Sequence, residues 1–368
     1  MNDTKTIHEI IIGNAQNAVA IADQSVDLIV TSPPYPMIEM WDEIMASLNP
    51  KIKDALVSGQ AKIAFELMHA ELDKVWEDVN RVLKPGGIAC INIGDATRTI
   101  NGDFSLHPNH SRIITKFLSL GFNNLPNIIW RKQTNAPNKF MGSGMLPAGA
   151  YVTLEHEWIL IFRKGGKRLF QSEIDKSKRR SSSFFWEERN SWFSDLWEFK
   201  GVRQFLGNTE SRDRSAAFPF ELPYRLINMY SLKGDVVYDP FLGTGTTTIA
   251  ALASERNSKG IEIDTNLNSL ICGRIEGLYI EKLNSIVSER LKQHEVFIGE
   301  YKKEIKHFNN SLKMSVITSQ ETDMSFSYVT TIEKKLHNMY EVKYTAAQTI
   351  ADIIPLLPKY KKQATLGF

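Results

Sequence analysis

The sequence predicts an α/β protein with a mostly parallel β-sheet that is covered by helices on both faces. Seven segments have the apolar pattern of buried strands, and helical segments separate most of them, which is typical of a parallel sheet. Two of these strands, which end near residues 31 and 240, run directly into loops rich in proline or glycine. The predicted strands lie near residues 8–13, 26–31, 87–93, 125–131, 156–163, 235–240 and 259–263.

The clearest helix between these strands runs from about residue 64 to residue 83. Apolar side chains recur there with helical spacing, and the glycines at 86–87 end the pattern. Three further helices are predicted, over residues 111–120, 246–256 and 265–293.

Composition indicates an intracellular, cytoplasmic enzyme. The 368 residues, 42% of them hydrophobic, allow one large domain with attachments or two domains. Cys90 and Cys272 lie in apolar patterns, so we expect them in the core rather than in a disulfide. The chain shows no charged-then-apolar leader, and no apolar run approaches the roughly 18 residues of a membrane span, so no membrane partner is expected.

Basic charge is concentrated in two parts of the chain, although the formal net charge is only +2. Residues 163–214 carry 13 Lys and Arg against 8 Asp and Glu, and residues 291–368 carry 11 against 8. The remaining residues are therefore acidic on balance. Such a distribution is typical of a protein that binds a polyanion through attached segments.

The first unusual loop is Thr31-Ser32-Pro33-Pro34-Tyr35, which follows the predicted strand at 26–31. The carboxyl ends of parallel strands are where α/β sheets bind ligands. The two prolines fix the backbone and lack an N–H, so the carbonyl groups here can accept hydrogen bonds from a ligand. The loop is expected to form a rigid cup, with the ring of Tyr35 facing a flat ligand.

The second loop, residues 239–247, joins a strand to a helix and contains Gly243 and Gly245. The glycines allow a ligand to approach the backbone closely. A third glycine, as in dinucleotide sites, is absent because position 248 is Thr, and no phosphate-binding lysine follows. The next strand ends with Glu262 and Asp264, which are acids suited to ribose hydroxyls. The pattern favours a nucleoside that lacks a pyrophosphate.

Together the two loops resemble the motifs of DNA amino-methyltransferases, which methylate exocyclic nitrogens with S-adenosylmethionine. The catalytic motif precedes the cofactor motif, which is the order of the circularly permuted β group. The resemblance covers roughly residues 7–275. It implies a Rossmann-like, S-adenosylmethionine-dependent methyltransferase fold with a seven-stranded sheet, and a site-specific enzyme similar to the cytosine-N4 methyltransferases of restriction–modification systems.

The resemblance also implies roles for individual residues. Catalysis is assigned to Ser32, Pro33, Pro34 and Tyr35, and no metal is expected. S-adenosylmethionine is expected to contact Asn14, Thr31, Phe218, Pro219, Asp239, Pro240, Phe241, Gly243, Gly245, Thr246, Thr247, Glu262 and Asp264.

The expected chemistry explains the catalytic residues. An exocyclic amine is a poor nucleophile, and two acceptors, the Ser32 hydroxyl and the Pro33 carbonyl, favour its pyramidal form. The ring of Tyr35 can stabilise the cationic nitrogen. The target base must be flipped out of double-stranded DNA. In the family that the loops resemble, Ser before Pro-Pro usually marks cytosine-N4 enzymes, so the resemblance implies cytosine N4, with adenine N6 as the alternative. An RNA methyltransferase and a catalytically silent DNA-binding module are further alternatives.

The resemblance divides the chain into two catalytic-domain halves and two attachments. Residues 1–162, with an insertion at about 36–63, form the catalytic half, and 215–293 form the cofactor half. Residues 163–214 are the predicted target-recognition segment, and 294–368 are an extension of unknown role. The expected partners are DNA and, functionally, a cognate restriction endonuclease.

The target-recognition segment holds nine aromatic residues, including three tryptophans. We expect Trp186, Trp192 and Trp197 to form a small satellite core. Phosphate contacts are predicted for Lys178, Arg179 and Arg180, and base-edge contacts for Arg203, Gln204 and Asn208.

Overall fold

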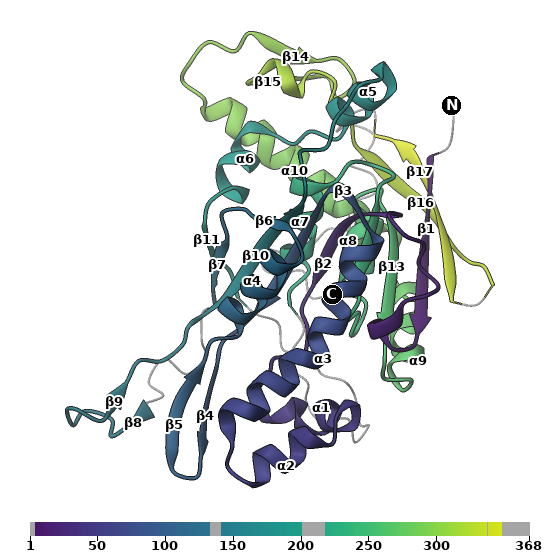
Figure 1. Ribbon diagram of the computed structural model, residues 1–368. Coiled ribbons are helices and arrows are strands. Elements are labelled where there is room, and N and C mark those ends of the chain that lie inside the picture. The colour runs from purple at the N-terminus through teal and green to yellow at the C-terminus, as the bar shows by residue number, and fades with distance from the viewer. Residues whose placement is uncertain (1–3, 133–140, 201–217, 337, 348–368) are drawn as a thin grey trace.

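The seven predicted strands are confirmed and lie side by side in one sheet (Figure 1). The computed structural model describes residues 4–132, 141–200, 218–336 and 338–347. Within them the sheet order is β11-β7-β10-β3-β2-β12-β13-β1-β17-β16. Of the seven strands only β10 runs against the others. They are β1 (Thr4–Ile12), β2 (Val26–Thr31), β3 (Leu83–Ile93), β7 (Ile128–Arg131), β10 (His156–Lys164), β12 (Val236–Asp239) and β13 (Asn257–Glu262).

Four strands that the sequence did not predict extend this sheet. The short strand β6 (Phe122–Asn124) pairs with β10, and β11 (Leu196–Glu198) pairs with β7. At the other edge β17 (Met339–Ala346) pairs antiparallel with β1, and β16 (Ser327–Lys334) follows it. Part of the C-terminal extension therefore completes the sheet, so the count of seven strands was too low for the whole sheet.

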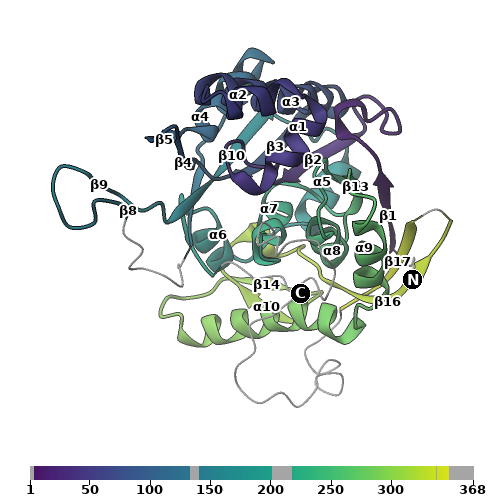
Figure 2. The same cartoon turned by 90° about the horizontal axis from the view of Figure 1, so that it is seen from below.

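Helices cover both faces of the sheet, as predicted (Figure 2). One face packs against α1 (Asp42–Leu48), α2 (Lys51–Val57), α3 (Ala61–Val82) and α4 (Asn109–Ser119). The other packs against α7 (Glu221–Tyr230), α8 (Thr246–Ala253) and α10 (Ile280–Glu300). Neighbouring residues of β2 divide between the two cores, Ile29 into the first and Leu28 into the second, because successive side chains of a strand point to opposite faces.

The predicted long helix at 265–293 was wrong, because two helices occupy this region. The first, α9 (Leu267–Glu276), ends at Gly277, and α10 begins at Ile280. A Cβ at position 277 would lie 2.9 Å from the carbonyl oxygen of Gly273, so glycine allows the close turn that separates them. The helix predicted at 64–83 is confirmed as α3, which ends at Val82 because Leu83 already has extended backbone angles.

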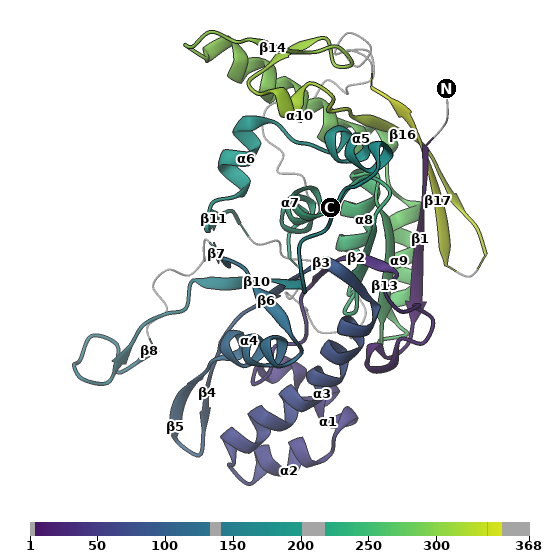
Figure 3. The same ribbon diagram turned by 45° about the horizontal axis from the view of Figure 1, so that its top comes forward.

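Two β-hairpins lie outside the main sheet and project from the body of the molecule (Figure 3). One consists of β4 (Ala96–Ile100) and β5 (Asp103–His107), and the other of β8 (Met141–Gly142) and β9 (Ala150–Tyr151). Stacking of the Phe104 and Tyr151 rings, whose centroids are 4.5 Å apart, joins the two hairpins. At the end of the molecule away from these two hairpins lie α5 (Glu173–Ser181) and a short hairpin of β14 (His307–Asn309) and β15 (Met314–Val316) (Figure 1).

Candidate active site

A pocket opens at the carboxyl ends of β1, β2, β12 and β13, where both predicted loops lie. The loop after β2 and the loop after β12 both form parts of its wall, and α1 and α3 contribute apolar side chains. Ten of the predicted site residues line it: Asn14, Ser32, Pro33, Pro34, Phe218, Pro240, Phe241, Gly243, Thr246 and Glu262. Thr31, Tyr35, Pro219, Asp239, Gly245, Thr247 and Asp264 do not.

Asp239 supports this wall from behind. Its carboxylate accepts hydrogen bonds from the hydroxyls of Thr31 and Thr247, each at 2.6 Å, and from the backbone N–H of Phe241 at 3.0 Å. Burial raises the pKa of Asp239 to about 6 in spite of these donors. The side chains of Thr31, Asp239 and Thr247 therefore turn toward one another and form a buried clamp that joins β2, β12 and α8.

Glu262 lines the pocket and is oriented by backbone groups. Its two carboxylate oxygens accept from the N–H groups of Gly243 and Asp264, each at 2.8 Å, and burial raises its pKa. The side chain of Asp264 accepts from the Asn266 N–H at 3.0 Å and stabilises the following turn instead of reaching the pocket.

The glycines at 243 and 245 have left-handed backbone angles, with φ of 56° and 84°. Other residues adopt these angles at a cost, which explains why glycine stands at both positions. Thr246, the first residue of α8, also lines the pocket, and its buried hydroxyl has no hydrogen-bond partner within the part of the chain that the structure describes. At this wall a ligand can therefore meet the hydroxyl of Thr246, the carboxylate of Glu262 and a stretch of backbone that no side chain covers at Gly243.

The sequence reasoning missed the contribution of α3 to the pocket. Glu71, Leu72 and Val75 line it from this helix. Glu71 is almost completely buried, and its Oε2 accepts from the side chains of Lys74 at 2.5 Å and Gln16 at 2.9 Å. An acid among the apolar positions of an amphipathic helix was the available signal.

Beside the pocket, Ser32 and Tyr35, two of the predicted catalytic residues, belong to a connected polar cluster. The Ser32 hydroxyl donates to the Tyr35 hydroxyl at 3.1 Å, and Tyr35 donates to Oε2 of Glu157 at 2.9 Å. Nδ2 of Asn92 contacts both the Tyr35 oxygen and Oε2 of Glu157, while Lys132 forms an ion pair with Oε1 of Glu157. We call these five residues the cup network. Neither Asn92 nor Glu157 was predicted as a site residue.

Burial, followed by the negative charge of Glu157, raises the pKa of Tyr35 well above its ordinary value, so the phenol stays protonated.

Gly94 makes the close packing of Tyr35 against Glu157 possible. A Cβ on Gly94, just after β3, would lie 2.9 Å from Cε2 of Tyr35 and 3.4 Å from Cγ of Glu157.

The basic triplet predicted to contact phosphate lies far from this pocket. It is on α5, near the amino end of β12, whereas the pocket lies at the carboxyl ends of the strands (Figure 1). Lys178 forms an ion pair with Asp235 at 3.1 Å, and Arg180 with Asp323 at 2.8 Å. The guanidinium of Arg179 lies over the ring of Phe170.

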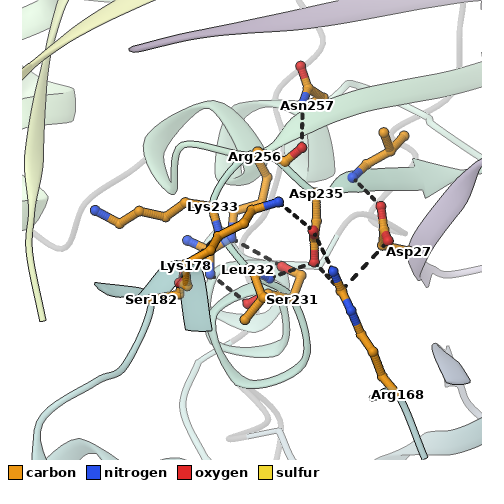
Figure 4. Close-up of polar contacts among 12 residues, drawn as sticks. Asp27, Arg168, Lys178, Ser182, Ser231, Leu232, Lys233, Asp235, Arg256 and Asn257 are labelled. Carbon is orange, nitrogen blue, oxygen red and sulfur yellow. Dashed lines mark hydrogen bonds and ion pairs between the residues drawn. The ribbon is translucent and has the colours of Figure 1, made fainter. Parts of the chain in front are cut away.

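Figure 4 shows Lys178 and Arg168 converging on Asp235, which directly precedes β12. Lys178 and Arg180 thus pair with acids of the chain, whereas the guanidinium of Arg179 lies over a ring, and phosphate contact by the triplet stays a prediction. Arg203, Gln204 and Asn208 lie outside the described residues.

The tryptophans do not form the predicted satellite core, because Trp197 belongs to the main core that α7 and α8 cover and Trp186 lies at the surface. Trp192 and Trp197 are buried, and the Trp197 ring nitrogen donates to the Trp192 carbonyl at 3.0 Å. Trp186 is partly exposed and stacks on Phe297 of α10.

Comparison with known proteins agrees with the pocket and its two loops. The sequence model of the family described as DNA methylase matches residues 26–271. The type II methyltransferase M.MthZI of Methanothermobacter thermautotrophicus is 51% identical over 365 residues, which are 99% of each chain. The type II methyltransferase M.MjaI of Methanocaldococcus jannaschii is also 51% identical, over 73% of this chain and 91% of the relative.

Solved structures show the same fold. A putative DNA modification methylase of Thermus thermophilus, complexed with S-adenosyl-L-methionine, is 33% identical, has a TM-score of 0.55 and is matched over 73% of this chain and 94% of its own. PvuII DNA methyltransferase, named as cytosine-N4-specific, has a TM-score of 0.52 at 17% identity and agrees in fold alone; the match covers 78% of this chain and 94% of that one. No helix among the described residues has the length and apolar character needed to cross a membrane. The chain belongs to the N6/N4 family of DNA methylases and has the permuted methyltransferase fold that its two loops predict.

Proposed function

We propose that this protein methylates the exocyclic N4 of cytosine in double-stranded DNA with S-adenosylmethionine, as the modification enzyme of a restriction–modification system. The observation that carries the proposal is the position of Ser32 and Pro33 at the wall of the pocket, next to the hydroxyl of Tyr35. The type II methyltransferases at 51% identity support the biological setting.

The pocket suits S-adenosylmethionine, which supplies an electrophilic methyl group on a sulfonium. Glu262 offers carboxylate oxygens to ribose hydroxyls, and Thr246 offers a free buried hydroxyl. The aromatic and aliphatic wall of Trp41, Leu72 and Phe241 accommodates a flat base. The turn at Gly243 and Gly245 carries no side chain at these two positions, so the cofactor can approach the backbone at the pocket wall.

The cup acts on the other reactant. The Ser32 hydroxyl and the Pro33 carbonyl accept from the two N–H groups of the amine and favour its pyramidal, nucleophilic form. The ring of Tyr35 stabilises the positive charge that develops on nitrogen. Positioning of the amine in line with the sulfonium accounts for much of the remaining acceleration.

The choice of cytosine rests on Ser32. Aspartate or asparagine at this position would favour adenine N6, which is the second candidate. Serine, aspartate and asparagine side chains all accept hydrogen bonds from an amine. The residue type therefore gives only a preference between the two bases, and an assay must decide.

DNA is proposed to lie along the two projecting hairpins rather than along α5. The hairpins connect at the carboxyl ends of β3 and β7, the edge that carries Ser32. The tip of the second exposes Met145 and Leu146, which are 85% and 70% accessible. Apolar side chains of this kind act as wedges between base steps in proteins that open or bend DNA.

The decisive experiment is transfer of labelled methyl groups to duplex DNA, RNA and no nucleic acid, followed by mass spectrometry of the digested nucleosides. N4-methylcytosine in DNA is expected, and Ser32→Ala protein prepared in parallel should give far less of it. N6-methyladenine would refute the base assignment, and methylated RNA alone would refute the substrate. Met145→Ser with Leu146→Ser should weaken DNA binding while cofactor affinity stays unchanged; unchanged DNA affinity would exclude the hairpin tip.

A further inference from the structure

Glu157 is a buried acid of the cup network to which the reaction described so far gives no role. It is the second residue of β10, and its side chain is only 12% accessible. Three elements supply its partners: Lys132 follows β7, Asn92 lies on β3, and Tyr35 lies in the loop after β2. The fold thus brings an acid to within one hydroxyl of the catalytic serine.

The partners of Glu157 divide between its two oxygens. Lys132 contacts Oε1 and compensates the negative charge, while the Tyr35 hydroxyl and Asn92 donate to Oε2. Both oxygens of the carboxylate are therefore held by charge-assisted contacts. The titratable groups that contact it are Lys132 and Tyr35, and Asn92 is neutral.

A continuous line of hydroxyls connects Ser32 to this carboxylate. The oxygens of Ser32 and Tyr35 are 3.1 Å apart, and those of Tyr35 and Glu157 are 2.9 Å apart. Both distances permit proton transfer along a hydrogen bond. The donor direction runs from Ser32 through Tyr35 toward Glu157, as proton movement away from the pocket requires.

We propose that Glu157 receives the proton that the target amine loses on methylation, through the hydroxyls of Ser32 and Tyr35. The inference rests on the proposed function. When nitrogen bonds to the methyl carbon, the sulfur–carbon bond breaks and sulfur keeps the electron pair. The cationic nitrogen passes one proton to the Ser32 oxygen, the Ser32 proton moves to Tyr35, and the Tyr35 proton moves to Oε2 of Glu157. The base and both hydroxyls are then neutral, and Glu157 later releases the proton to solvent.

Tyr35 is suited to this relay because it does not hold a negative charge. Its raised pKa means that a free tyrosinate is unfavourable, so the phenol gives up its own proton only as it receives another. Because the hydroxyl of Tyr35 stays protonated, it keeps its hydrogen bonds to both Ser32 and Glu157. The ring face and the hydroxyl of Tyr35 thus serve different steps.

A simpler role for Glu157 is to hold Tyr35 in place, and E157Q separates the two roles. The amide oxygen of glutamine still accepts from the Tyr35 hydroxyl, but glutamine cannot take up a proton. A matched control is E155Q, because Glu155 is a partly exposed acid two residues away that pairs with Arg131. Both variants lose one negative charge from the same strand end.

The test is single-turnover methyl transfer to duplex DNA by the full-length protein, from pH 5 to 9. The wild-type rate must first be measurable, and its absence would fault the proposed function rather than the relay. We expect E157Q to lose about 10²-fold in rate, the lower end of a general-base contribution. Its affinities for S-adenosylmethionine and DNA, measured by calorimetry and fluorescence anisotropy, should stay within threefold of wild type, as should every property of E155Q.

The pH profile and a second variant distinguish proton transfer from positioning. The decline in rate at low pH should be present in wild type and E155Q and absent in E157Q. Tyr35→Phe keeps the ring but breaks the relay, so it should lose rate similarly, and combining it with E157Q should add little. An E157Q rate within threefold of wild type, or losses that multiply in the double variant, would overturn the relay.

Discussion

Replacement of Gly243 by alanine tests whether the loop after β12 binds the cofactor through its backbone. Gly243 lines the pocket, and a Cβ there would meet no described protein atom closer than the Phe241 carbonyl oxygen at 3.9 Å. The added methyl group would therefore occupy open space at the pocket wall. Its cost to folding is the left-handed backbone, about 1–2 kcal/mol for a residue other than glycine.

Gly245→Ala is the matched control. Its φ of 84° imposes a similar backbone cost, and its Cβ would lie 3.2 Å from Cγ2 of Ile271, but Gly245 does not line the pocket. Gly245→Ala should therefore destabilise the fold at least as much as Gly243→Ala. Only Gly243→Ala should weaken cofactor binding directly, by tenfold or more, which corresponds to about 1.4 kcal/mol.

The assays are urea unfolding for stability and calorimetry for S-adenosylmethionine affinity. Both variants must be folded at the calorimetry temperature. If Gly243→Ala binds the cofactor as tightly as wild type, the loop does not approach it. If both variants lose affinity equally, the substitutions loosen the loop in general. The inference that a methyl group at Gly243 blocks the cofactor directly is then refuted.

Three further predictions concern the clamp, the cup and α5. Because burial raises the pKa of Asp239 from its usual 3.8 to about 6, the folded state holds this proton more tightly than the unfolded state. Stability should therefore fall by up to about 3 kcal/mol as pH rises from 4 to 7, and Asp239→Asn should flatten that part of the unfolding profile. Ser32→Ala should keep cofactor affinity in calorimetry but lose most methyl transfer, because its interaction strengthens in the transition state; near-full turnover would place the cup elsewhere. Neutralising 178–180 should lower the unfolding midpoint through the lost pair with Asp235, yet leave DNA affinity and its salt slope unchanged; a slope reduced by about one unit per residue would restore the phosphate contacts.

Local patterns predicted the framework of the fold and the wall of the pocket. The strand before Ser32 and the loop at 239–247 are marked by residues that act within their own segments, such as prolines that fix φ and glycines at left-handed angles. Such signals need no knowledge of the partner strand. The resemblance of these loops to the motifs of the family assigned roles to ten residues that line the pocket, and also to Asp239, whose inward turn depends on hydroxyls contributed by two other elements.

The missed residues depend on contacts between distant parts of the chain. Tyr35 and Glu157 are 122 residues apart, and Glu157 has the sequence context of an ordinary strand end. The pairing of β17 with β1 joins the two ends of the described chain, and no local pattern specifies an edge partner. The position of α5 was missed for the same reason, because a basic composition does not indicate which edge of the sheet the charges face.

The order of the two motifs along the chain has no effect on the chemistry, because the sheet places their strands next to each other. β2, which ends in the proposed catalytic loop, pairs in parallel with β12, which ends in the proposed cofactor loop. Thr31 at the end of the first strand donates to Asp239 at the end of the second, so the two loops are fixed relative to each other by one buried hydrogen bond of 2.6 Å. Since parallel neighbours end at the same edge, any chain order that keeps β2 beside β12 builds the same pocket. The cup network extends this edge to β3, β7 and β10, which bring an acid and its counter-ion close to Ser32, the proposed catalytic serine.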